Sequence, residues 1–132
     1  MSFRVILTIV FVMFETLPLD AWADDCGLEG SSAWAGCQSL KSFEIVDKEL
    51  NATYRRLTSA MDKREWRETR AKLLSSQRAW ISFRDKECAF AQELSGGANK
   101  APGLDCQTDM TKERTAYLQR VLEQLKSRDH AP

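Results

Sequence analysis

A long run without glycine or proline, residues 63–94, constrains the fold of this chain more than any other feature. The two residues that interrupt helices most strongly are missing from it, so the run favours one long helix. Steps of three and four residues trace one stripe along it, which consists of Trp66, Arg70, Leu73, Gln77, Trp80, Arg84, Cys88 and Ala91. Gln77 and Arg84 are polar, and an unpaired buried polar group costs about 1–3 kcal/mol. The stripe therefore predicts a helix whose buried face carries a hydrogen-bonded polar layer.

The first 23 residues have the pattern of an export signal. Arg4 precedes an apolar run of ten residues, 5–14, and Ala21-Trp22-Ala23 then provides a small-x-small cleavage pattern. A bilayer span needs about 20 apolar residues, so this run is too short for one. We expect cleavage after residue 23, a single domain over residues 24–132, and a periplasmic or secreted location.

Charged residues balance, with 19 Lys and Arg against 19 Asp and Glu. A balanced chain provides no electrostatic reason to expect a nucleic acid or an anionic membrane as partner. Cys26 also lacks the preceding pattern of a lipidated cysteine. We therefore expect no nucleic-acid partner, and no membrane attachment after the signal is removed.

The cysteines indicate disulfides rather than a metal site. All four, Cys26, Cys37, Cys88 and Cys106, follow the predicted cleavage site, and an even number in a small exported domain is typical of two disulfides. Zinc is the alternative, but the chain has no Cys-x-x-Cys pair and its only histidine, His130, lies near the end. No metal or other cofactor is expected.

Two further helices are predicted. An apolar stripe that begins at Cys37 predicts a helix over about residues 32–60, with Ser31 or Ser32 as its N-cap. Glycine and proline predict a loop over residues 95–105, and a second apolar stripe predicts a helix over about residues 108–126. The predicted fold class is all-α: an antiparallel helical hairpin with a third helix packed against it, cross-linked by disulfides.

The hairpin is predicted to turn near Asp62, which begins an Asp-x-x-Glu pattern of the capping-box type. Facing residue numbers in such a hairpin add to about 125, as those of Cys37 and Cys88 do. This favours the disulfides Cys37–Cys88 and Cys26–Cys106, although four cysteines allow three pairings.

Partners for the polar stripe are expected from the first helix. Asp47, Asn51 and Tyr54 lie on or beside the apolar stripe of that helix and face Gln77 and Arg84 in the predicted hairpin.

Catalysis finds little support in these residues. The single histidine is near the end and the cysteines are expected in disulfides, so no nucleophile–base pair remains. Asp47, Asp85 and Glu87 offer carboxylates, but carboxylates near Arg78 and Arg84 more often form structural ion pairs. Trp34, Trp66, Trp80 and Phe83 offer a binding surface, although Trp66 and Trp80 lie on the stripe and favour the core. The residues predict a non-enzymatic binding protein.

Two segments carry a family resemblance. Residues 47–54 (Asp-Lys-Glu-Leu-Asn-Ala-Thr-Tyr) and 77–88 (Gln-Arg-Ala-Trp-Ile-Ser-Phe-Arg-Asp-Lys-Glu-Cys) resemble the LprI-type lysozyme inhibitor family of small exported bacterial proteins. Gly96-Gly97, Cys106 and Thr111-x-x-Arg114 follow in that family's order, so the resemblance covers about residues 37–125. The residues of the motif that form the expected polar layer are Asp47, Asn51, Tyr54, Gln77, Trp80, Arg84 and Asp85.

The resemblance implies a helical domain, and some members of the family bind and inhibit lysozyme. We expect an exported protein of this type that acts by direct protein–protein contact. The alternatives are an adaptor or immunity-like protein that binds another envelope protein, and a cell-wall hydrolase that uses Asp85 or Glu87. No family motif marks an inhibitory contact, so no residue receives that role, and the oligomeric state is left open.

Overall fold

The computed structural model of the chain describes residues 26–129. Three long helices make up almost all of it: α1 (Ser32–Ala60), α2 (Arg67–Leu94) and α3 (Ala101–Asp129). A short 3-10 turn, η2 (Arg64–Trp66), precedes α2, and no strand occurs among the described residues. The all-α prediction is confirmed. The predicted export signal and His130 lie outside the described residues.

The sequence predicts the start of α1 correctly. Ser31 caps α1, because its side-chain Oγ accepts a hydrogen bond from the backbone N–H of Trp34 at 3.1 Å. The chain turns after Met61, as expected, and continues through η2 into α2. The second helix begins at Arg67, later than the Asp-x-x-Glu pattern at Asp62 predicts, and its N-cap Trp66 makes no side-chain capping hydrogen bond. The third helix begins at Ala101, earlier than predicted.

The predicted loop over residues 95–105 is therefore too long. Pro102 lies in the first turn of α3, where a missing N–H costs nothing and a fixed φ suits the helix. Asn99 Oδ1 accepts a hydrogen bond from the N–H of Ala101 at 3.0 Å, which helps to start the helix there. Proline and glycine usually interrupt helices, but the first turn of α3 tolerates both.

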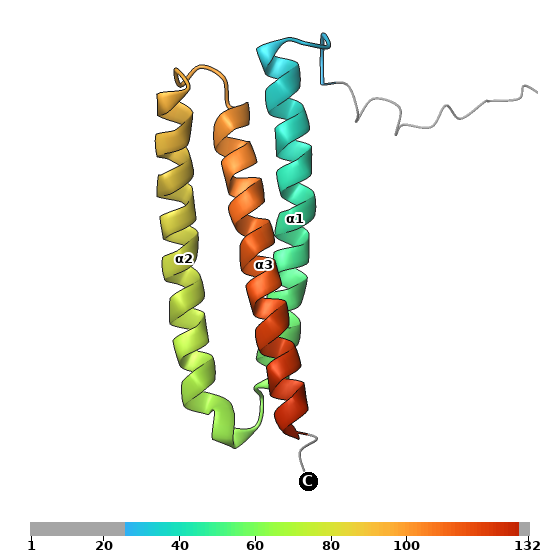
Figure 1. Cartoon of the computed structure of the whole chain (residues 1–132), viewed down its shortest axis with the longest axis vertical. Coiled ribbons are helices and arrows are strands. Elements are labelled where there is room, and N and C mark those ends of the chain that lie inside the picture. The colour runs from blue at the N-terminus through green and yellow to red at the C-terminus, as the bar shows by residue number, and fades with distance from the viewer. Residues whose placement is uncertain (1–25, 130–132) are drawn as a thin grey trace, which may run out of the picture.

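The three helices lie side by side, and α3 lies between α1 and α2 (Figure 1). α1 and α3 run parallel to each other, and α2 runs antiparallel to both (Figure 1). α3 packs extensively on α1 and less on α2, whereas α1 and α2 have few close approaches. The arms of the hairpin are antiparallel, as predicted, but the third helix fills most of the space between them.

Both preferred disulfide pairings are consequently wrong. The structure has Cys26–Cys37, which ties the N-terminal segment to α1, and Cys88–Cys106, which joins α2 to α3. Cys37 and Cys88 line opposite sides of one groove instead of meeting. The pairing rule assumed direct contact between the first two helices, and the position of α3 removes that contact.

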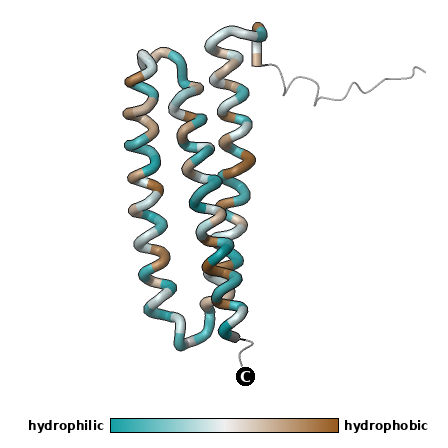
Figure 2. Tube along the Cα trace, in the orientation of Figure 1, coloured by the Kyte–Doolittle hydropathy of each residue, from teal (hydrophilic) through white to brown (hydrophobic). Residues whose placement is uncertain are grey.

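Hydrophobic and hydrophilic residues alternate along all three helices (Figure 2). The apolar core lies between α1 and α3 in the half of the bundle that contains η2, and it consists of Leu50, Leu57, Met61, Leu118, Leu122 and Leu125. Tyr54, Trp66, Leu73 and Trp80 pack against it while remaining partly exposed. The two tryptophans of the stripe therefore contribute to the core.

Candidate functional site

Arg84 occupies the centre of the bundle and contacts all three helices. Its side chain is only 8% exposed, although it carries a permanent charge. Nη1 lies 3.5 Å from Asp47 Oδ1 of α1, and Nη1 donates a hydrogen bond to Thr111 Oγ1 of α3 at 3.2 Å. Nε donates to Asp85 Oδ1 on the same helix at 3.0 Å. The charge is therefore paired and hydrogen-bonded, which a buried charge requires.

Two aromatic rings complete the surroundings of Arg84. Its guanidinium carbon lies 5.1 Å from the centre of the Phe43 ring and 5.2 Å from that of Trp80. A cation over an aromatic face is stabilised by about 0.5–2 kcal/mol, with the larger values at desolvated positions. The aromatic rings thus help to hold the guanidinium where Asp47 and Asp85 meet.

Gln77 belongs to a second polar cluster, on the other side of Trp80. Gln77 Oε1 accepts a hydrogen bond from Arg114 Nε of α3 at 2.9 Å, and Arg114 Nη2 donates to Ser76 Oγ at 3.2 Å. The guanidinium also lies over the rings of Trp80 and Tyr117. Burial lowers the pKa of Arg114 below its ordinary value, and Tyr117 partly opposes that shift.

Two of the three expected partners of the polar stripe belong to the Arg84 cluster, and none belongs to the Gln77 cluster. Asp47 reaches Arg84, and Asn51 Nδ2 donates to Asp47 Oδ2 at 2.9 Å. Gln77 pairs with Arg114, a residue of the third helix, and not with the first helix as expected. Tyr54 packs against the apolar core instead of joining either cluster. Asp47, Gln77 and Arg84 of the motif therefore connect helices to one another. Asn51 and Asp85 remain exposed.

Thr111 and Arg114 are the residues that sequence reasoning assigned no role. Both appear in the family pattern at the start of the last helix, so their spacing was visible. Periodicity alone did not indicate that this helix, rather than the first, supplies the partner of Gln77.

Two of the three carboxylates that could serve acid–base chemistry are engaged by Arg84. Asp47 and Asp85 both bind the Arg84 guanidinium, and Glu87 is exposed. Among residues 26–129, no cluster of three or more His, Cys, Asp or Glu side chains is arranged to hold a metal ion. This arrangement supports a structural role for Asp47 and Asp85.

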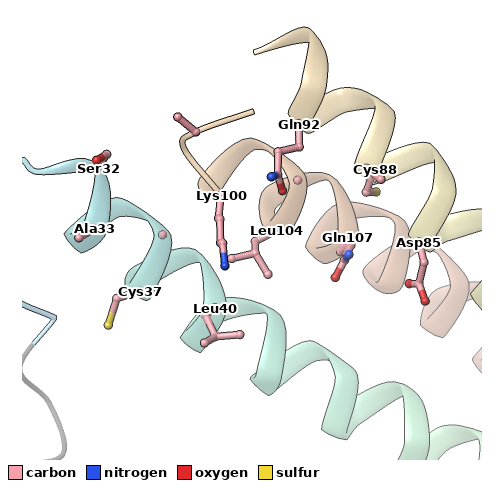
Figure 3. Close-up of a pocket in the computed structure, with 14 residues that line it drawn as sticks. Ser32, Ala33, Cys37, Leu40, Asp85, Cys88, Gln92, Lys100, Leu104 and Gln107 are labelled. Atoms are coloured by element: carbon pink, nitrogen blue, oxygen red, sulfur yellow. The ribbon is translucent and has the colours of Figure 1, made fainter. Parts of the chain in front are cut away.

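A groove of about 640 Å³ opens between α1 and α2 in the half of the bundle opposite η2 (Figure 3). Its volume is within the range of about 300–1,000 Å³ that small-molecule sites occupy. α1 lines one side with Cys37 and Leu40, α2 lines the other with Asp85 and Cys88, and α3 contributes Leu104 and neighbouring residues. It is an open groove of mixed polarity, bordered by one cysteine of each disulfide.

The outer face of α2 carries the largest set of exposed apolar side chains. Phe83, Phe90 and Leu94 are 56%, 58% and 72% exposed, and their spacing of seven and then four residues places them on one side of the helix. Phe83 lies off the buried stripe, as the sequence indicated, and the structure leaves it uncovered. We name these three residues the α2 apolar strip. Clustered exposed apolar side chains mark interaction surfaces more often than isolated ones do.

Helix length and hydropathy bear on membrane insertion. None of the helices in the described part of the chain combines the length and the apolar character that a membrane span requires.

Comparison with known proteins adds a family assignment. A family model described as "Lysozyme inhibitor LprI" matches residues 31–118. The chain is 31% identical over 94 residues to the uncharacterized protein R02472 of Rhizobium meliloti. The aligned region covers 63% of this chain and 68% of that protein. It is 30% identical over 113 residues to the uncharacterized protein YecT of Escherichia coli K12. The aligned region covers 72% of this chain and 70% of that protein. No solved structure matches the chain significantly.

The matched region contains α1, α2 and most of α3, together with both polar clusters and the Cys88–Cys106 disulfide. The chain therefore belongs to the LprI lysozyme inhibitor family.

Proposed function

We propose that this protein is an exported binding protein that inhibits lysozyme by direct contact, and that the α2 apolar strip contributes to the contact surface. The family match over residues 31–118 is the observation that supports inhibition of lysozyme. The observation that favours the strip is its exposure: Gln77 and Arg84 of the family motif bond to other helices, whereas Phe83 of the same motif is more than half exposed, as are Phe90 and Leu94.

Physical properties of the strip suit a protein partner. Aromatic side chains supply large apolar area with few rotatable bonds, so they are enriched among residues that dominate binding energy. The strip lies on a long helix that a disulfide and the Arg84 cluster hold in place. A surface of this kind loses little conformational entropy when it binds.

Purified protein should slow the lysis of bacterial cell walls by lysozyme at near-stoichiometric ratios. Phe83→Ser combined with Phe90→Ser should raise the concentration needed for half inhibition more than tenfold. Ile45→Ser is the matched control, because Ile45 is 67% exposed on α1 and lies outside the strip. It should leave inhibition unchanged.

The outcomes separate the two parts of the proposal. Absence of inhibition by the unmodified protein, at large excess over several lysozyme types, would reject lysozyme as the target. Inhibition that the strip variant retains in full would reject the strip alone and direct attention to the groove between α1 and α2.

Under this proposal the protein is exported and has no enzymatic activity. Export rests on the signal pattern of residues 1–23, and mass spectrometry of the protein secreted by a bacterial host should show a chain that begins at Asp24. The absence of catalysis rests on the engagement of Asp85 by Arg84. Cell walls incubated with the protein alone should release no fragments.

A further inference from the structure

Charge is distributed unequally along the bundle although the whole chain is neutral. We name the end that contains η2 the basic end, and its described basic side chains are Arg55, Arg56, Lys63, Arg67, Arg70, Lys72, Arg120, Lys126 and Arg128. Its described acidic side chains are Asp62, Glu65, Glu68 and Glu123.

The opposite end has the reverse balance, and we name it the acidic end. It comprises the first part of α1, the last part of α2 and the first part of α3 (Figure 1). Its acidic residues are Glu29, Glu44, Asp85, Glu87, Glu93, Asp105, Asp109 and Glu113, and its basic residues are Lys41, Arg84, Lys86, Lys100 and Lys112. Acidic residues remain in excess when Arg84, the partner of Asp85, is counted.

Helix dipoles explain only part of this separation. A cation is favourable near the C-terminus of a helix, which accounts for Lys126 and Arg128 at the end of α3. The same effect disfavours cations at the start of α2, where Arg67 and Arg70 lie. Arg70 forms an ion pair with Asp62 at 2.9 Å, but Arg67 has no ion-pair partner among the described residues. No ion pair among the described residues therefore accounts for Arg67 at this position.

The basic side chains surround the end of the bundle instead of converging on one point. Arg55, Arg56 and Lys126 line a shallow hollow between α1 and α3. Arg67 and Arg70 line hollows on the side where α1 faces α2. Cations that are spread around one end can contact a broad, negatively charged surface together, whereas a single small anion would reach only a few of them.

We infer that the basic end binds the anionic headgroups of a phospholipid bilayer, with the long axis of the bundle upright on the surface. A helix of 29 residues is about 43 Å long, whereas salt screens charges beyond about 8 Å at physiological ionic strength. The acidic end therefore lies outside the field of the surface and does not oppose binding. The balanced net charge, which by itself provides no reason to expect a membrane partner, is an average over two ends of opposite charge.

This inference does not depend on lysozyme as the target. Binding at the basic end leaves the groove between α1 and α2 and the far part of the α2 apolar strip directed away from the bilayer. A protein held in this way remains available to a partner in solution.

Vesicle binding tests the inference. The exported form of the protein, with both disulfides intact, is sedimented with vesicles of phosphatidylcholine alone and with vesicles that also contain phosphatidylglycerol. The protein should bind only the second kind, and its binding should weaken as salt is raised. Arg55→Gln combined with Arg67→Gln should weaken binding about thirtyfold, since each cation near an anionic surface contributes about 1 kcal/mol.

Lys86→Gln combined with Lys112→Gln is the matched control, because it removes two exposed cations from the acidic end. It should change binding less than twofold, and circular dichroism should show equal helix content in both variants. Equal binding to both kinds of vesicle, no binding to either, or equal losses in the two variants would each overturn the inference. Salt-sensitive self-association without vesicle binding would also overturn it, and would assign the basic end to the acidic end of a second copy.

Discussion

The two halves of the bundle are stabilised in different ways. In the half that contains η2, leucines of α1 and α3 form a continuous apolar core. In the other half the buried residues are small, polar or cross-linked, as in Ser39, Arg84, Cys88, Ala101 and Thr108. The first half is stabilised mainly by apolar burial, and the second by a disulfide, a paired guanidinium and close backbone approach.

The difference follows from how little apolar area the second half can bury. A fully buried leucine contributes about 1.5–3 kcal/mol relative to an exposed one, and the second half has no such leucine among its buried residues. In the second half, where little apolar area is buried, the disulfide and the paired guanidinium therefore take the place of apolar burial as the main stabilising interactions. This half also contains the groove, so it combines an open surface with a rigid frame.

The largest expected effect is in the leucine core. Leu57 is fully buried, and Leu57→Ala should lower the free energy of unfolding by about 3–5 kcal/mol through lost burial and a residual cavity. Urea unfolding monitored by circular dichroism measures the change. Ile45→Ala, at an exposed position of the same helix, should change stability by less than about 0.5 kcal/mol.

Arg84→Ala tests the polar link of the second half. Breaking a buried pair from one side costs about 3–5 kcal/mol, and Asp47 and Asp85 are partly exposed, so we expect about 3 kcal/mol. Arg78→Ala, at an exposed position of the same helix, should be nearly neutral. A greater loss in Arg84→Ala than in Leu57→Ala would reverse the comparison between the halves.

Removal of the Cys88–Cys106 disulfide should cost about 2–3 kcal/mol, given its sequence separation of 18 residues. Thermal unfolding of Cys88→Ala combined with Cys106→Ala measures this loss. Cys26→Ala combined with Cys37→Ala should cost less, because that disulfide ties only the segment before α1. Equal losses would show that the N-terminal segment contributes more to the bundle than its position indicates.

The smallest effect concerns two helical glycines with opposite expectations. A Cβ at Gly103 would lie 2.8 Å from Gln92 Oε1 and 3.2 Å from the backbone oxygen of Cys88, so Gly103→Ala should destabilise the protein by about 1–2 kcal/mol. A Cβ at Gly36 would meet only Lys100 Cβ, at 3.8 Å. Gly36→Ala should therefore stabilise α1 by about 0.5–1 kcal/mol. Melting temperatures that shift in the same direction would contradict the role of close approach at Gly103.

The sequence alone was sufficient for the local features of this protein. The apolar stripe and Ser31 placed α1 at the residues where the structure has it, and the run from residue 63 placed the end of α2 at Leu94. The stripe also showed that Gln77 and Arg84 lie on a buried face. These properties depend on residues within a few turns of one another, so periodicity and capping determine them.

Only the tertiary structure decided which helix covers each face. Periodicity shows that Gln77 is buried but not that Arg114, rather than Asp47, approaches it. The position of α3 between α1 and α2 reassigned both disulfides, created the groove and brought basic residues of all three helices to one end. An apolar stripe shows which side of a helix is buried, but not which neighbouring helix covers that side. Three helices can therefore bury their stripes in more than one arrangement. Packing between segments distant in sequence selects among these arrangements.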